Sequence, residues 1–138
     1  MNESSFETYA KPTRVAVVGT GLVGSTYAYT ILLQGLCDEI CLIDQKADKA
    51  RGEAMDLNHS LPFTRRTGIW AGTPDDLPEA DLIMISAGTN QRPGQSRMDL
   101  LRENAGIVGD IAEEAGAKNP GSILLVTTNP VDVMTYVA

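Results

Sequence analysis

The sequence predicts an α/β protein built on a doubly wound, parallel sheet of five strands. Two observations support this fold class: short apolar runs alternate with segments of helical periodicity, and a glycine-rich turn follows the first run. Strands that alternate with helices of this length are joined by right-handed crossovers, which place helices on both faces of the sheet. With 138 residues, 43% of them hydrophobic, the chain has room for one such domain and its core.

Five runs rich in branched aliphatic residues predict the strands, and their continuous apolar character predicts burial on both faces. In chain order they are RVAVVG (14–19), EICLID (39–44), TGIWA (67–71), DLIMIS (81–86) and SILLVT (122–127). Residues 1–13 are mostly polar and are expected to form a flexible N-terminal arm. Residues 14–138 are therefore predicted to be the folded domain.

Segments of helical periodicity predict the helices between these strands. Residues 22–34 are mostly apolar or small and precede Gly35, a residue type that commonly ends helices. Two further helices are predicted by recurring apolar positions, which are Ala47, Ala50, Ala54 and Leu57 in one and Met98, Leu101, Ala105, Val108, Ala112 and Ala115 in the other. The third and fourth strands are joined only by AGTPDDLPEA, where at most one helical turn is expected.

Composition limits the partners of the chain. Eleven basic against eighteen acidic residues give a net charge of −7, which repels nucleic acids and anionic membranes. No signal peptide or membrane-spanning run is recognisable, so a cytoplasmic location is predicted. Cys37 and Cys41 would lie about 13 Å apart in an extended segment, beyond the roughly 7 Å that a disulfide permits, and are expected to be free thiols. With His59 as the only histidine, no metal site is expected.

The first strand runs into GTGLVG, in which Gly19, Gly21 and Gly24 form a GxGxxG pattern. Gly19 permits a tight turn, Gly21 lets the backbone approach a pyrophosphate, and Gly24 allows close packing of helix on strand. The next strand ends in Asp44, whose carboxylate could accept hydrogen bonds from an adenosine ribose and would repel a 2′-phosphate. The pattern predicts a Rossmann domain that binds NAD rather than NADP. The alternative for Asp44 is a capping role at the following helix.

Four segments resemble the lactate and malate dehydrogenase family, in the family's order. They are GTGLVGS (19–25), LIDQKADKARGEAMDLNHS (42–60), AGTNQRPGQSRMDLLRENAGI (87–107) and TNPVDVMTY (128–136). The resemblance implies that Gly88 and Thr89 contact the cofactor beside its pyrophosphate, and that Val23 and Lys49 lie near the glycine turn and the adenosine. It also implies that Asn129 hydrogen-bonds the substrate and helps to hold the nicotinamide end of the site.

The loop GTNQRPGQSR (88–97), termed the lid loop below, resembles the segment that closes over cofactor and substrate in this family. The resemblance implies that Arg97 enters the site with the lid and stabilises the negative charge that develops on the substrate oxygen during reduction. The alternative is that Arg97 merely begins a solvent-exposed helix. Gln91 matches the position that selects the substrate, and its neutral side chain implies pyruvate and L-lactate. Because Arg92 is adjacent, a lactate-like malate dehydrogenase remains the alternative.

The resemblance also implies that the acid–base histidine, its aspartate partner and the arginine that anchors the substrate lie in a second domain. His59 is expected to be structural or interfacial, and the 138-residue chain is expected to bind NAD without turnover. The family's sixth strand is expected to be missing through truncation, leaving residues 122–127 as an exposed edge that favours a homo-oligomer. The lid loop is then expected to be disordered or held in an unproductive pose. A nucleotide-binding module without catalytic function is a third possibility.

Overall fold

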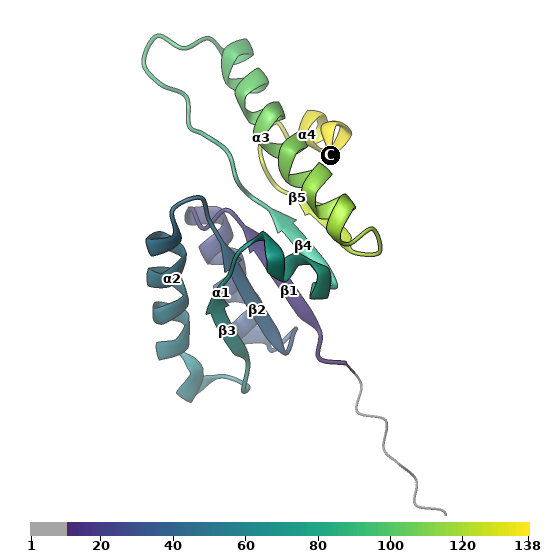
Figure 1. The fold of residues 1–138 in the computed structure, drawn as a ribbon. Coiled ribbons are helices and arrows are strands. Elements are labelled where there is room, and N and C mark those ends of the chain that lie inside the picture. The colour runs from purple at the N-terminus through teal and green to yellow at the C-terminus, as the bar shows by residue number, and fades with distance from the viewer. Residues whose placement is uncertain (1–10) are drawn as a thin grey trace, which may run out of the picture.

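The computed structural model describes residues 11–138, which form a five-stranded parallel sheet with helices on both faces (Figure 1). In chain order the elements are β1 (Arg14–Val18), α1 (Leu22–Gln34), β2 (Glu39–Ile43), α2 (Ala47–His59), η1 (Leu61–Phe63), β3 (Gly68–Ala71), η2 (Pro74–Glu79), β4 (Leu82–Ile85), α3 (Arg97–Lys118), β5 (Ile123–Val126) and α4 (Val131–Val137). The strand order β3-β2-β1-β4-β5 places the reversal of winding between β1 and β4. The predicted fold class is confirmed. Of the predicted arm, residues 1–10 lie outside the described residues, and residues 11–13 are exposed and irregular.

Two hydrophobic cores lie on opposite faces of the sheet, because successive side chains of a strand alternate between its faces. On one face the strand residues Val17, Leu42 and Met84 pack against α1 and α2. On the other face Ala16, Ile83 and neighbouring strand residues pack against α3, α4 and η2. The three central strands, β1, β2 and β4, are buried on both faces as predicted.

The prediction of two-sided burial is wrong for β3 and β5, which form the edges of the sheet among the described residues. In β5, Leu124 and Val126 pack into the core beneath α3 and α4, whereas Ile123 remains 65% exposed and Leu125 37% exposed. The helices of the other face pack elsewhere, α1 on β1 and α2 on β2 and β3, and leave this side of β5 uncovered. An apolar run therefore predicted the strand correctly, but not its exposure.

The predicted helices are present, and the connection between β3 and β4 contains a longer helix than expected. Helix α1 has the predicted bounds and ends at Gly35, whose φ of 61° is the left-handed conformation that glycine adopts easily. Helix α3 begins at Arg97, after Ser96, whose hydroxyl accepts a hydrogen bond from the Asp99 amide. Between β3 and β4 the six-residue 3-10 helix η2 replaces the single turn expected, because Thr73 begins it with a capping box.

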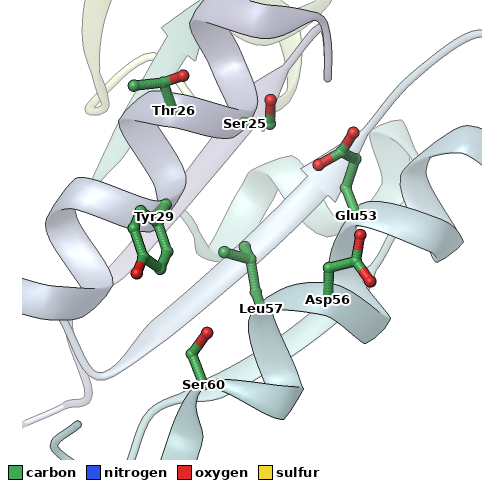
Figure 2. Close-up of a pocket in the computed structure, with 7 residues that line it drawn as sticks. All are labelled: Ser25, Thr26, Tyr29, Glu53, Asp56, Leu57 and Ser60. Carbon is green, nitrogen blue, oxygen red and sulfur yellow. The ribbon is translucent and has the colours of Figure 1, made fainter. Parts of the chain in front are cut away.

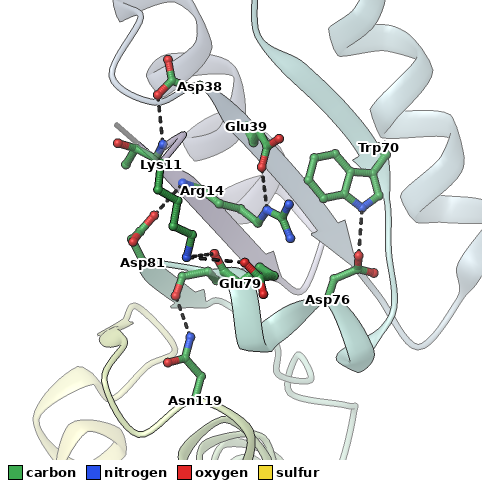
Figure 3. Close-up of polar contacts among 11 residues, drawn as sticks. Lys11, Arg14, Asp38, Glu39, Trp70, Asp76, Glu79, Asp81 and Asn119 are labelled. Carbon is green, nitrogen blue, oxygen red and sulfur yellow. Dashed lines mark hydrogen bonds and ion pairs between the residues drawn. The ribbon is translucent and has the colours of Figure 1, made fainter. Parts of the chain in front are cut away.

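Polar contacts link the amino-terminal ends of the strands, which we call the amino edge of the sheet (Figure 3). The Arg14 Nε donates to Glu39 Oε2 over 2.7 Å, and the guanidinium lies 4.9 Å from the centroid of the Trp70 ring. The indole of Trp70 donates to Asp76 at 3.4 Å, and the Arg14 amide donates to Asp81 at 2.8 Å. These side chains join β1, β2, β3 and η2, so this edge serves the stability of the fold.

Both cysteines are buried free thiols. Burial raises the pKa of Cys37 to about 11 and that of Cys41 to about 12, and the nearby carboxylates of Asp38 and Asp76 raise them in the same direction. At neutral pH the two thiols are protonated and act as small apolar groups of the core.

Within residues 11–138, no group of three or more His, Cys, Asp or Glu side chains is arranged to hold a metal ion. In the same part of the chain, no helix combines the length and the apolar character needed to cross a membrane.

Candidate functional site

The glycine turn brings the start of α1 to the carboxyl edge of the sheet. Gly19 has a φ of 100°, and a Cβ there would lie 2.5 Å from the Ala87 amide nitrogen. A Cβ on Gly24 would overlap the carbonyl oxygen of Gly19, which accepts a hydrogen bond from Ser86 Oγ at 2.7 Å. These two glycines are therefore required by the close approach of β1, α1 and β4.

Gly21 is different, because the space above it is open. A Cβ built there would meet only Lys49 Nζ, at 4.0 Å. Gly21 is also the N-cap of α1, and no side chain caps that helix or places a negative charge in its first turn. The free N–H groups and the positive end of the helix dipole thus face a space that suits an anionic group such as a pyrophosphate.

Asp44 lies at the end of β2 and links this strand to the glycine turn. Its Oδ2 accepts hydrogen bonds from the amide and the hydroxyl of Thr20, both at 2.9 Å, and Lys49 Nζ is 3.9 Å away. Burial of the carboxyl opposes its ionisation, but the hydrogen bonds from Lys46 and Thr20 and the charge of Lys49 bring its pKa below the ordinary value. Asp44 therefore carries a negative charge at neutral pH.

The capping alternative for Asp44 is partly correct. Its Oδ1 accepts a hydrogen bond from the amide of Lys46, the N-cap residue of α2, at 2.9 Å. The same carboxylate thus positions the start of α2 and the glycine turn. These contacts do not exclude a ribose as a further partner, because each carboxylate oxygen can accept more than one hydrogen bond.

A cavity of about 250 Å³ lies at the carboxyl ends of β4 and β5, beside the first turn of α1. Five residues predicted for the site line it together, and they are Val23, Gly88, Thr89, Gln91 and Asn129. They come from α1, from the segment after β4 and from the segment after β5, three parts of the chain that only the fold brings together. Ligands of open α/β sheets bind at this edge, at the point where the winding reverses.

Sequence reasoning missed two buried polar residues that support this cavity. Asn104 on α3 accepts a hydrogen bond from the Thr89 amide at 2.8 Å, and it is 4% exposed. Thr128, which is 8% exposed, donates to the carbonyl oxygen of Ala87 at 2.7 Å. Asn104 lies four residues before Val108 on the buried stripe of α3, so an amide among apolar positions was the signal available in the sequence.

The lid loop leaves the sheet after β4 and extends away from it before α3 begins (Figure 1). Gln91 lines the cavity, while Arg97 is exposed at the first position of α3 and is not part of the lining. The structure therefore unites Gln91 with Asn129 but keeps Arg97 apart from them. In this arrangement the solvent-exposed alternative describes the position of Arg97.

A wider hollow of about 350 Å³ lies between α1 and α2 (Figure 2). Its lining includes the carboxylates of Glu53 and Asp56 and the hydroxyl groups of Ser25 and Tyr29. Two carboxylates in an open hollow disfavour an anionic dinucleotide, and neither the glycine turn nor Asp44 contributes to it. The smaller cavity at the carboxyl edge is therefore the candidate site.

His59 is not part of the cavity lining. It is exposed at the carboxyl end of α2, a helix that runs back from the carboxyl edge toward the amino edge. The histidine thus lies at the opposite end of the domain from the cavity.

A parallel sheet with a glycine turn after β1, an ionised aspartate after β2 and a cavity beyond β4 and β5 is the arrangement of a dinucleotide-binding domain. The family described as lactate/malate dehydrogenase, NAD binding domain, matches residues 13–138. The chain belongs to this family, and the predictions of the family and of NAD as its cofactor are confirmed.

The similar proteins are named as lactate or malate dehydrogenases. L-lactate dehydrogenase of Geobacillus thermodenitrificans is 51% identical over 89% of this chain, and probable L-lactate dehydrogenase of Schizosaccharomyces pombe is 47% identical over 98%. A lactate dehydrogenase from a deep-sea metagenome has a similar structure, with a TM-score of 0.88 and 45% identity over 93% of this chain, which covers 41% of that protein. Malate dehydrogenase of Archaeoglobus fulgidus, solved with NADH, gives a TM-score of 0.82 and 43% identity over 91% of this chain and 43% of its own. The chain spans 39% and 41% of the two sequence relatives.

Proposed function

We propose that the chain is the NAD-binding domain of an L-lactate dehydrogenase, an enzyme that reduces pyruvate to L-lactate with NADH. The observation that carries the proposal is the cavity at the carboxyl edge, which the neutral residues Gln91 and Asn129 line together with Val23 of the first turn of α1. A neutral lining residue suits the methyl group of pyruvate, whereas a second carboxylate would require a cation.

Different residues of this chain would bind different parts of the dinucleotide. The open space over Gly21 and the uncapped start of α1 fit a pyrophosphate, with Gly19 and Gly24 shaping the turn. Asp44 would accept hydrogen bonds from the adenosine ribose, and Lys49 would lie near the adenosine. Val23, Gly88, Thr89 and Asn129 line the cavity and would contact the cofactor there. NAD supplies the hydride chemistry when bound, while the protein orients the reacting groups and excludes water.

The catalytic role of Arg97 depends on movement of the lid loop. In the closed enzyme its guanidinium would stabilise the negative charge that builds on the substrate oxygen as the carbonyl is reduced. No histidine of this chain lies near the cavity, and we propose that residues 1–138 on their own bind NAD without turnover. The acid–base group and the carboxylate anchor would come from other parts of the enzyme.

A homo-oligomer is part of the proposal, supported by the exposed side of β5 with Ile123 and Leu125. The net charge of −7 speaks against a nucleic-acid partner. The sequence alone predicts a cytoplasmic location and a domain that begins at residue 14, after an arm of residues 1–13.

The proposed function can be tested with the full-length enzyme by measuring NADH oxidation with pyruvate and with oxaloacetate. Pyruvate should be favoured in kcat/KM by about tenfold or more, because a buried second carboxylate without a cation is costly. A preference for oxaloacetate would support the malate alternative, and failure to oxidise NADH with either oxoacid would refute both readings in favour of a non-catalytic module.

A further inference from the structure

A polar network joins the lid loop to α3 through a single carboxylate. Glu103 Oε2 accepts a hydrogen bond from Gln95 Nε2 at 2.9 Å, and Glu103 Oε1 pairs with Arg92 Nη2 at 3.3 Å. The Arg92 amide donates to Gln95 Oε1 at 3.0 Å, which closes the ring of three residues. Both carboxylate oxygens of Glu103 thus contact the loop, although Glu103 lies six residues beyond the last loop residue, Arg97.

The network separates the two neighbouring residues that could contact a substrate. Gln91 lines the cavity, whereas Arg92 is absent from its lining and directs its guanidinium to Glu103. The side chain of Glu103 is 33% exposed and that of Arg92 is 70% exposed, so the ion pair lies at the surface, outside the cavity. The Gln91 side chain is itself fixed by donating to the Gln95 carbonyl oxygen at 2.7 Å.

We infer that Glu103 is a positioning residue for substrate specificity, which holds Arg92 away from the cavity and so leaves Gln91 to face the substrate. This inference rests on the proposed function. Arg92 is the cation that lies nearest in the chain to the substrate-selecting position, and a guanidinium pairs readily with a carboxylate. If Arg92 entered the cavity, the enzyme would gain a partner for the second carboxylate of a dicarboxylic oxoacid. By occupying Arg92, Glu103 disfavours that class of substrate.

The size of the effect follows from the exposure of the pair. A single exposed ion pair contributes little, but here the carboxylate also accepts a hydrogen bond from Gln95, and the three residues form a closed network. Loss of the network should therefore change the ratio of two substrates by about three- to tenfold rather than by orders of magnitude.

The test compares Glu103→Gln with wild type in the full-length enzyme, using pyruvate and oxaloacetate as substrates. The ratio of kcat/KM for oxaloacetate to that for pyruvate should rise about three- to tenfold, mainly through a lower KM for oxaloacetate. In the double variant Arg92→Gln/Glu103→Gln this rise should disappear, because the freed cation is gone. Glu113→Gln, an exposed carboxylate on the same helix, is the matched control and should leave the ratio unchanged.

Amide hydrogen exchange of residues 91–96 in the same variants gives a second readout. Exchange should be faster in Glu103→Gln and unchanged in Glu113→Gln, because only the first releases the loop. An unaltered substrate ratio in Glu103→Gln, a rise that persists in the double variant, or unaltered exchange would each overturn the inference. A wild-type enzyme that reduces neither oxoacid would instead refute the proposed function.

Discussion

Substitution of Arg97 by Gln in the full-length enzyme should lower kcat for pyruvate reduction by about 100- to 1000-fold. The reason is electrostatic, because the substrate oxygen gains negative charge as the hydride is transferred and a neutral amide stabilises it poorly. In the structure Arg97 is exposed at the start of α3 and outside the cavity, so its charge would act only after the lid loop closes. NADH affinity should change little, since no residue of the glycine turn is altered.

The matched control is Arg102→Gln, which removes the same charge from an exposed position five residues further along α3. Steady-state kinetics with saturating NADH should show near wild-type kcat for this variant. Two results would mean that Arg97 does not act in the transition state. One is an equal decrease of kcat in both variants, and the other is a higher KM for pyruvate with unchanged kcat in Arg97→Gln.

Substitution of Gly24 by Ala should destabilise the domain by about 3 kcal/mol or more. The added methyl group would overlap the carbonyl oxygen of Gly19 and approach Ser86 Oγ to 2.6 Å. Neither neighbour can retreat easily, because Gly19 is packed against the backbone of Ala87 and its carbonyl is bonded to Ser86. Helix α1 would have to move away from β1, which opens the core between them.

Gly52→Ala provides the control, because Gly52 lies in α2 and a Cβ there meets nothing within 4 Å. That variant should be more stable than wild type by about 0.5–1 kcal/mol, since alanine is the better helix former. Urea unfolding followed by the fluorescence of Trp70, the single tryptophan, measures both changes. A Gly24→Ala protein as stable as wild type would show that the close contact between turn and helix is not required.

The sequence was most informative where one local pattern determines the structure. The bounds of α1, the end of that helix at Gly35 and the central strands follow from periodicity, a left-handed glycine and continuous apolar runs. Periodicity could not predict the side-chain exposure of β5, because that exposure depends on which helices reach this edge of the sheet. Only the family resemblance implied that residues 122–127 form an exposed edge. The length of η2 depends on a side-chain cap at Thr73 that strand and helix periodicity do not reveal.

The site was predicted in the same uneven manner. Gly88 and Asn129 were predicted from recognisable motifs, and the fold brings them together at the cavity. Asn104 and Glu103 were missed because their side chains contact the lid loop from α3. The spacing of residues along one helix does not predict such contacts. Their roles follow only from the three-dimensional arrangement.

Binding of NAD by the glycine turn and its cavity is tested most directly by titrating NADH into wild type and Gly21→Val in a calorimeter. Gly21 has an extended backbone, with φ of −71° and ψ of −173°, and open space around it, so valine should be tolerated by the fold. Wild type should bind one NADH per chain, and the variant should unfold at the same urea concentration yet lose at least about 100-fold in affinity, because its side chain occupies the pyrophosphate position. Equal NADH affinity in both proteins, or no saturable binding to wild type, would contradict NAD binding at this position.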